Sequence, residues 1–89
     1  MQDVGKLRLD KWLWAARFFK TRSLAKSAIE GGKVHCGSER CKASKEIRVG
    51  DQLQIRQGLD QRSVEVLQLS DQRRGAPEAQ LLYRESAES

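Results

Sequence analysis

The sequence has no apolar run that approaches the roughly 18 residues of a membrane-spanning helix. Its opening residues, Met1 to Lys6, also hold no apolar stretch of the kind found in a secretory signal. These absences predict a cytoplasmic protein that does not enter a membrane. Cysteine is scarce, and in that compartment we expect Cys36 and Cys41 to be reduced thiols.

Groups typical of catalysis or metal binding are lacking too. The sequence shows no nucleophile with a base, no pair of carboxylates and no phosphate-binding glycine loop, since Gly31-Gly32 is placed to end a helix. Structural zinc needs four ligands, whereas His35, Cys36 and Cys41 are the only soft candidates near one another. A chain of 89 residues forms one domain. We therefore expect no enzyme activity, no metal and no cofactor.

Acidic residues are sparse in the first half of the chain. Residues 1–48 carry twelve Lys and Arg against five Asp and Glu, whereas residues 49–89 carry five against seven. Asp10 is the only carboxylate between Val4 and Ile29. Such a density of positive charge is unfavourable by self-repulsion unless a polyanion binds there. The uneven charge predicts one binding face and one solvated face.

Apolar residues at helical spacing predict a first helix in this basic segment. Its apolar stripe comprises Leu9, Trp12, Leu13 and Ala16. We expect Asp10 to be its N-cap and the helix to run to about Phe18 or Phe19. At least two of the four large aromatic side chains between residues 12 and 19 are expected to pack on strands. The alternative for Trp14 or Phe19 is an exposed position that stacks on a base.

A second helix is predicted after a short polar break. Thr21 or Ser23 is expected to cap it through the hydroxyl group, and Gly31-Gly32 to end it. Arg22 and Lys26 lie four residues apart and therefore share its polar face. Its apolar side comprises Leu24, Ala25, Ala28 and Ile29.

Short extended pieces follow Gly32. Residues 33–36 and 39–41 flank a Gly37-Ser38 hairpin turn, and residues 53–56 and 63–69 alternate as half-buried strands do. Pro77 is placed to begin a closing helix with Ala79, Leu82 and Tyr83 on one side. The fold class is therefore α+β, with two N-terminal helices packed on a small, mainly antiparallel sheet and a C-terminal helix.

The candidate site consists of basic and hydroxyl side chains around the two helices. These are Arg8, Lys11, Arg17, Lys20, Thr21, Arg22, Ser23, Lys26 and Lys33, extended by Lys42 and Lys45 on a later loop. Arginine forks and lysine ammonium groups match phosphate oxygens, and a helix start offers free N–H groups. Charge gathered at a turn between short helices favours structured RNA over duplex DNA. Solvated surface charge and an anionic membrane are the alternatives.

This segment resembles the RNA-binding domain named after small-subunit ribosomal protein four, the S-four domain. The residues that carry the resemblance are Arg8-Leu9-Asp10-Lys11, Leu13, Arg17, Thr21-Arg22, Ala25, Ile29, Gly32-Lys33-Val34, Lys42, Ser44 and Val49-Gly50-Asp51. The stretch from Arg8 to Arg22, the run Ile29 to His35 and the run Leu81 to Tyr83 resemble more closely the bacterial heat-shock protein 15 branch. The resemblance implies an αL motif, in which two helices precede a small sheet and present the RNA-contacting surface.

The resemblance also implies a function. The branch binds free large ribosomal subunits that hold a nascent chain on tRNA, and it aids their rescue in the stress response and ribosome quality control. The expected partners are ribosomal RNA, the large subunit and peptidyl-tRNA, with DNA as a weaker ligand and the protein as a monomer. The expected division of the chain is a lead-in at 1–7, an S-four-like domain at 8–70 with its αL core at 8–56, and a C-terminal segment at 71–89, shorter than in relatives.

Two further functions remain open at this point. The chain could be an RNA-binding accessory domain of an RNA-modifying enzyme such as a pseudouridine synthase, in which the same domain occurs. It could also be a protein-interaction module that uses a strand edge and the Trp side chains. The salt dependence of the affinity distinguishes RNA binding from protein binding, because phosphate contacts weaken steeply as the salt concentration rises.

Overall fold

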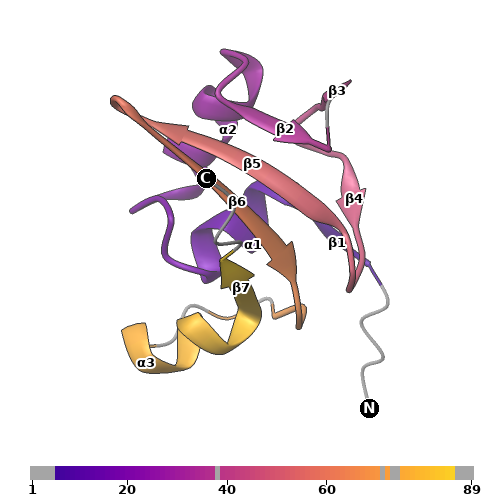
Figure 1. The fold of residues 1–89 in the computed structure, drawn as a ribbon, viewed down its shortest axis with the longest axis vertical. Helices are drawn as coiled ribbons and strands as arrows, with labels where there is room; N and C mark the ends of the chain where they lie inside the picture. Colours follow the sequence, from indigo (N-terminus) through magenta and orange to yellow (C-terminus); the bar gives the residue numbers. More distant parts are fainter. Residues whose placement is uncertain (1–5, 38, 71, 73–74, 86–89) are drawn as a thin grey trace.

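The protein is described by a computed structural model, which covers residues 6–37, 39–70, 72 and 75–85. Two helices, α1 (Leu9–Ala15) and α2 (Arg22–Glu30), pack against antiparallel strands (Figure 1). The main sheet has the order β3-β2-β5-β6-β7. Its strands are β2 (Val34–Cys36), β3 (Glu39–Arg40), β5 (Gln52–Gln57), β6 (Asp60–Val66) and β7 (Tyr83–Glu85). The predicted α+β fold is confirmed.

A second, two-stranded sheet joins the start of the chain to its middle. Strand β1 (Leu7–Arg8) pairs antiparallel with β4 (Glu46–Ile47), with Leu7 opposite Ile47. Neither strand was predicted from the sequence, because pairs of two residues leave no periodic pattern. The lead-in predicted for residues 1–7 falls on this strand only at Leu7, and residues 1–5 lie outside the described part of the chain.

Helix α1 begins two positions earlier and ends sooner than predicted. Arg8 is its N-cap, so the prediction that Asp10 caps it is wrong; Asp10 lies in the first turn and is 3% exposed. The helix ends at Ala15 because Arg17 adopts a φ of 67°. The amide of Arg17 then donates to Trp14 O and that of Phe18 to Leu13 O. This is the usual left-handed helix ending, and it returns the Phe18 ring to the core.

Helix α2 begins and ends at the predicted residues. Thr21 is its N-cap, and its Oγ1 accepts a hydrogen bond of 3.1 Å from the Leu24 amide. At the other end Gly32 has a φ of 81°, a conformation that glycine adopts without a steric penalty. One apolar position was predicted wrongly, since Leu24 is 51% exposed. It lies at the edge of the stripe formed by the buried residues Ala25, Ala28 and Ile29.

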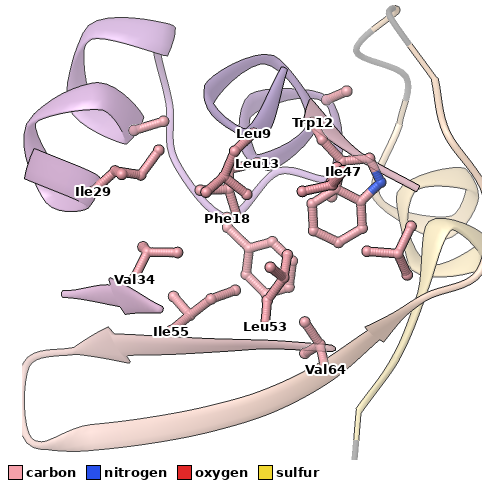
Figure 2. Packing of buried hydrophobic residues seen from close by; sticks show 14 of the residues in the cluster. Leu9, Trp12, Leu13, Phe18, Ile29, Val34, Ile47, Leu53, Ile55 and Val64 are labelled. Atoms are coloured by element: carbon pink, nitrogen blue, oxygen red, sulfur yellow. The ribbon is translucent and has the colours of Figure 1, made fainter. Parts of the chain in front are cut away.

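The core lies between the helices and the inner face of the main sheet. Figure 2 shows Leu9, Leu13 and Phe18 on one side of it and the side chains of Leu53, Ile55 and Val64 pointing toward them from β5 and β6. Burial of an aliphatic side chain of this size stabilises a fold by about 1.5–3 kcal/mol. The alternation in β5 confirms the strand predicted over residues 53–56.

The aromatic side chains divide as predicted. Trp12 and Phe18 are buried in the core, and the Trp12 Nε1 donates a 2.9 Å hydrogen bond to Gln68 O. Trp14 and Phe19 are partly buried against the same cluster, which leaves their base-stacking role a prediction. Tyr83 completes the group, with its ring centroid 4.7 Å from that of Phe18.

The C-terminal part differs from prediction in two respects. Strand β6 covers Asp60–Val66 and not residues 63–69, since the amides of Leu67 and Gln68 both donate to Leu82 O. The closing helix is short, comprising α3 (Ala76–Ala79) and the 3-10 turn η1 (Gln80–Leu82). Tyr83 starts β7, which pairs with β6 (Figure 1). The segment from 71 onward thus adds a strand to the main sheet, and the domain division stays a prediction.

The predicted hairpin is present. Strands β2 and β3 pair antiparallel, with Cys36 opposite Glu39, and Gly37 has a φ of 66°. The turn type depends also on Ser38, which lies outside the described residues. The hairpin brings the segment after β3 back toward α2, and this return places the basic residues described next.

Candidate nucleic-acid interface

Three of the predicted residues meet at one groove between α2 and the segment that follows β3. The groove has a volume of about 640 Å³. We call it the basic groove; its lining residues are Arg8, Lys26, Glu30, Arg40, Cys41, Lys42, Ala43 and Ser44. Four of them are cationic and one is a carboxylate, so its potential is positive. A groove with this charge attracts a polyanion and concentrates it at the surface.

One buried carboxylate organises two of the arginines. The Arg8 guanidinium donates to both Asp10 oxygens, at 3.2 and 3.0 Å, and an Arg22 Nη lies 3.6 Å from Asp10 Oδ1. The hydrogen bond and the charge of Asp10 raise the pKa of Arg8 above its ordinary value. The Arg8 and Arg22 side chains are still 48% and 46% exposed. The three groups carry a net charge of +1, so the carboxylate orients the guanidinium groups without cancelling their charge.

The predicted lysines are not paired with acidic groups. Within the described residues, none of Lys11, Lys20, Lys26, Lys33, Lys42 and Lys45 has its ammonium group within 4.0 Å of a carboxylate. Lys26 and Glu30 are one helical turn apart on α2 and both line the basic groove, without forming an ion pair. The ammonium charges are therefore available to a ligand.

The remaining predicted residues lie outside the lining of the basic groove. Lys11 lies on α1. Five others lie between the end of α1 and the first residues of α2, a segment (residues 16–23) that we call the helix turn: Arg17, Lys20, Thr21, Arg22 and Ser23. The Thr21 oxygen is occupied by the cap, which leaves its hydroxyl hydrogen as a donor for a phosphate.

Two predicted lysines lie away from the helix turn. Lys45 belongs to the segment that satisfies the start of α1, where its carbonyl accepts from the Leu9 amide at 2.8 Å. Lys33 follows α2 and lines a different, smaller hollow. The predicted set is thus divided between the basic groove, the helix turn and this hollow, with Lys11 on α1 and Lys45 beside the start of that helix.

Arg40 is a groove residue that sequence reasoning missed. Its Nη2 donates a 3.0 Å hydrogen bond to Glu30 O, at the carboxyl end of α2, where a cation is favoured by the helix dipole. The sequence signal was slight: a basic residue two positions before Lys42, in the strand that leaves the hairpin. The contact with α2 depends on how the hairpin returns, which spacing alone does not give.

The Cys36 and Cys41 thiols pack against the hydrophobic core. Burial raises the pKa of the Cys36 thiol to about 12, with the neighbouring Cys41 adding to the shift, so it is protonated at neutral pH. Cys41 Sγ donates to Val34 O at 3.5 Å.

Among the described residues no three His, Cys, Asp or Glu side chains gather as a metal site. In the same part of the chain, every helix is too short or too polar to span a membrane.

Comparison with known proteins shows a consistent set of relatives. The S4 domain model matches residues 7–53. The chain is 60% identical over 84 residues to the heat shock protein 15 homolog of Haemophilus influenzae. This match covers 94% of the chain and 64% of that protein. Over 65 residues the chain is 37% identical to the RQC P-site tRNA stabilizing factor of Bacillus subtilis, covering 73% of this chain and 76% of that protein.

A solved structure is also similar. Heat shock protein 15 of Vibrio cholerae, described as trimeric at 2.3 Å resolution, matches with a TM-score of 0.89 and 60% identity. The match covers 92% of this chain and 83% of that one. The chain spans 64% of the length of the Haemophilus relative.

Proposed function

We propose that this chain binds structured ribosomal RNA. It belongs to the S4 domain family and resembles heat shock protein 15 over nearly all of its own length. The observation that carries the proposal is the basic groove, where Arg8, Lys26, Arg40 and Lys42 meet with Glu30 as the one acidic lining residue. Lysine and arginine displace counterions from a phosphate backbone, and this release supplies most of the binding free energy.

The shape of the surface favours RNA over duplex DNA. A helix that reads DNA projects into the major groove, whereas α1 and α2 have seven and nine residues and bury one face against the sheet. The cations line a groove between α2 and the segment after β3, and this suits the irregular backbone of a folded RNA. DNA is then a weaker ligand that binds by charge alone.

The partners we propose are the free large ribosomal subunit and peptidyl-tRNA on it. The names of the relatives, a heat shock protein and a factor that stabilises a P-site tRNA, support this choice. The role is rescue or recycling of a stalled subunit in the cytoplasm, by a monomer that has no enzyme activity and uses no cofactor. Light scattering at the concentrations used for binding tests directly whether the protein is a monomer.

Cross-linking in a cell lysate, followed by sequencing of the attached RNA, tests the function. The proposal predicts that reads concentrate on a few segments of large-subunit ribosomal RNA. Reads spread over messenger RNA in proportion to its abundance would contradict it, as would binding unaffected by salt, which is the outcome for a protein-interaction module.

A matched pair of arginines tests the site within the same proposal. Arg22 and Arg84 each pair with a carboxylate and are 46% and 71% exposed, but Arg22 lies at the helix turn and Arg84 on β7. We expect Arg22→Ala to weaken binding of a ribosomal RNA fragment more than Arg84→Ala in a gel shift. Equal affinities would mean that the helix turn is not the contact.

A further inference from the structure

We infer that the open face of the main sheet carries a second RNA contact, an inference that rests on the proposed function and extends its binding surface. A hollow of about 80 Å³ lies there, which we call the sheet hollow. Its lining residues are Gly32, Lys33, His35, Gln54, Arg56 and Gln61. Figure 2 shows both helices on one side of β5 and β6, with Leu53 and Ile55 pointing toward them. Since strand side chains alternate, Gln54 and Arg56 point to the opposite side.

The sheet hollow presents donors that the protein does not use. In the described part of the chain, the side chains of Lys33, His35 and Arg56 form no hydrogen bond or ion pair with the protein. Among the residues that the structure describes, no carboxylate lines the hollow. Two cationic side chains and an imidazole without acceptors favour an anion, and a phosphate oxygen matches all three.

The floor of the hollow adds polar groups that suit a nucleotide. Gln54 lies opposite His35 on one side and Ser63 on the other, and its Oε1 accepts a 3.2 Å hydrogen bond from Gln61 Nε2. This bond holds both amides in place and leaves the Gln54 amide hydrogens and the Gln61 oxygen for a ligand. A ribose hydroxyl or a base edge both donates and accepts, so it fits a pair of this kind.

The sheet hollow adjoins the basic groove. Arg40 lines the groove, and its guanidinium atoms lie 3.7–3.8 Å from where a Cβ on Gly32 would stand. Gly32 in turn lines the hollow, and Lys33 follows it. An RNA strand that leaves the groove past Arg40 therefore reaches the hollow directly. The described residues that line the hollow include no apolar side chain, which disfavours a protein partner there.

A matched pair of arginine variants tests this inference. Arg56 lies near the end of β5, and Arg48 precedes its start, outside the hollow; both are exposed and each substitution by Gln removes one charge. With a large-subunit RNA fragment, Arg56→Gln should weaken binding severalfold and make the salt slope shallower by about 0.7 to 1 unit. Arg48→Gln should stay within about twofold of the parent, since it removes only long-range attraction.

A second readout reports on the hollow itself. Titration with the same RNA should shift the side-chain amide signals of Gln54 and Gln61 in a nitrogen-correlated NMR spectrum. Unshifted signals, or equal losses for Arg56→Gln and Arg48→Gln, would overturn the inference. If Lys26→Gln weakens binding while Arg56→Gln does not, the proposed function stands and only the second contact fails. If neither variant weakens binding, both fail.

Discussion

Asp10 is a single buried carboxylate that two arginines share where the two helices begin. It contacts both nitrogens of the Arg8 fork and lies 3.6 Å from Arg22. A guanidinium held in one orientation loses less side-chain entropy when it binds a phosphate. The acid is therefore best understood as a positioning residue inside a basic surface.

Asp10→Asn tests that role, because it removes the shared charge but keeps the side-chain volume. We expect the free energy of unfolding to fall by about 1.5–3 kcal/mol, the range for hydrogen bonds to a charged group. RNA affinity should also fall, although the net charge rises by one. Urea denaturation and a filter-binding titration measure the two effects.

The control for this variant is Glu46→Gln, which removes an exposed carboxylate paired with Lys6 and raises the net charge equally. It should leave RNA affinity unchanged or slightly raised. If Asp10→Asn binds RNA as well as Glu46→Gln, the carboxylate does not position the arginines.

Arg17 provides a second test at this scale, because it holds a left-handed conformation with a φ of 67°. A non-glycine residue pays about 1–2 kcal/mol there. We expect Arg17→Gly to be more stable than Arg17→Gln by about 1 kcal/mol in thermal unfolding, since both lack the guanidinium and only Gly relieves the backbone. Both should bind RNA more weakly than the parent. A less stable Gly variant would contradict the backbone account.

Individual residues differ in how well the sequence indicated them. The Thr21 cap and the Gly32 ending were predictable because both follow local rules about hydroxyls and positive φ. The burial of Asp10 and the contact of Arg40 with α2 were not, since each depends on side chains brought together by the folded hairpin and the helix pair.

Helix α2 depends on one hydroxyl at its start. Thr21→Ala removes the hydrogen bond to the Leu24 amide, and we expect a loss of about 1 kcal/mol in the free energy of unfolding. Ser23→Ala is the matched control, because Ser23 lies within the helix and makes no cap, so its stability should change by less than about 0.5 kcal/mol. Equal losses from the two substitutions would show that the cap does not hold the helix start.

Strand β7 is tied to β6 by Arg62, whose guanidinium donates to both Glu85 oxygens at 3.1 and 2.8 Å and lies 5.2 Å from the Phe18 ring centre. The hydrogen bond from Arg62 lowers the pKa of Glu85. The folded state therefore favours the carboxylate. The resulting stability is present above the ordinary glutamate pKa of 4.5 and is lost as pH falls through the lowered value.

We therefore expect Glu85→Gln to lower the free energy of unfolding at pH 7 by less than about 1 kcal/mol, since solvent reaches both side chains of the pair, which are 32% and 45% exposed. The gap from the parent should close as the pH falls through the lowered pKa of Glu85. Glu39→Gln, an exposed acid without an ion pair in the described residues, should show no such gap. A gap for Glu85→Gln that persists at low pH would contradict the role of the ion pair.

Elements with a long periodic pattern were predicted, as was the short β2–β3 hairpin from its glycine turn, whereas the short strands without a local signal were not. The stripes of α1 and α2 and the alternation in β5 come from several residues each. Strands β1, β4 and β7 have two or three residues and exist because distant segments pair, such as Val66 with Tyr83. That information is tertiary, so a local pattern does not contain it.

At the scale of the whole molecule, the charge asymmetry of the sequence reappears in the fold. The basic first half contributes the groove cations Arg8, Lys26, Arg40 and Lys42. The second half contributes most of the main sheet, and two acids of that sheet, Glu65 and Glu85, are paired with arginines of the same sheet. In the function we propose, the unpaired lysines of the first half supply most of the attraction to RNA, and the sheet supports the basic groove and adds the contact at the sheet hollow.

The most direct test is the salt dependence of binding to purified large ribosomal subunits, compared between the parent and a Lys26→Gln, Lys42→Gln double variant. If the ammonium groups of the basic groove contact phosphates, the logarithm of the binding constant should fall steeply with the logarithm of salt for the parent. The slope should be shallower by about 1.5 to 2 units for the variant. Parallel lines with the same slope would show that the groove does not hold the RNA.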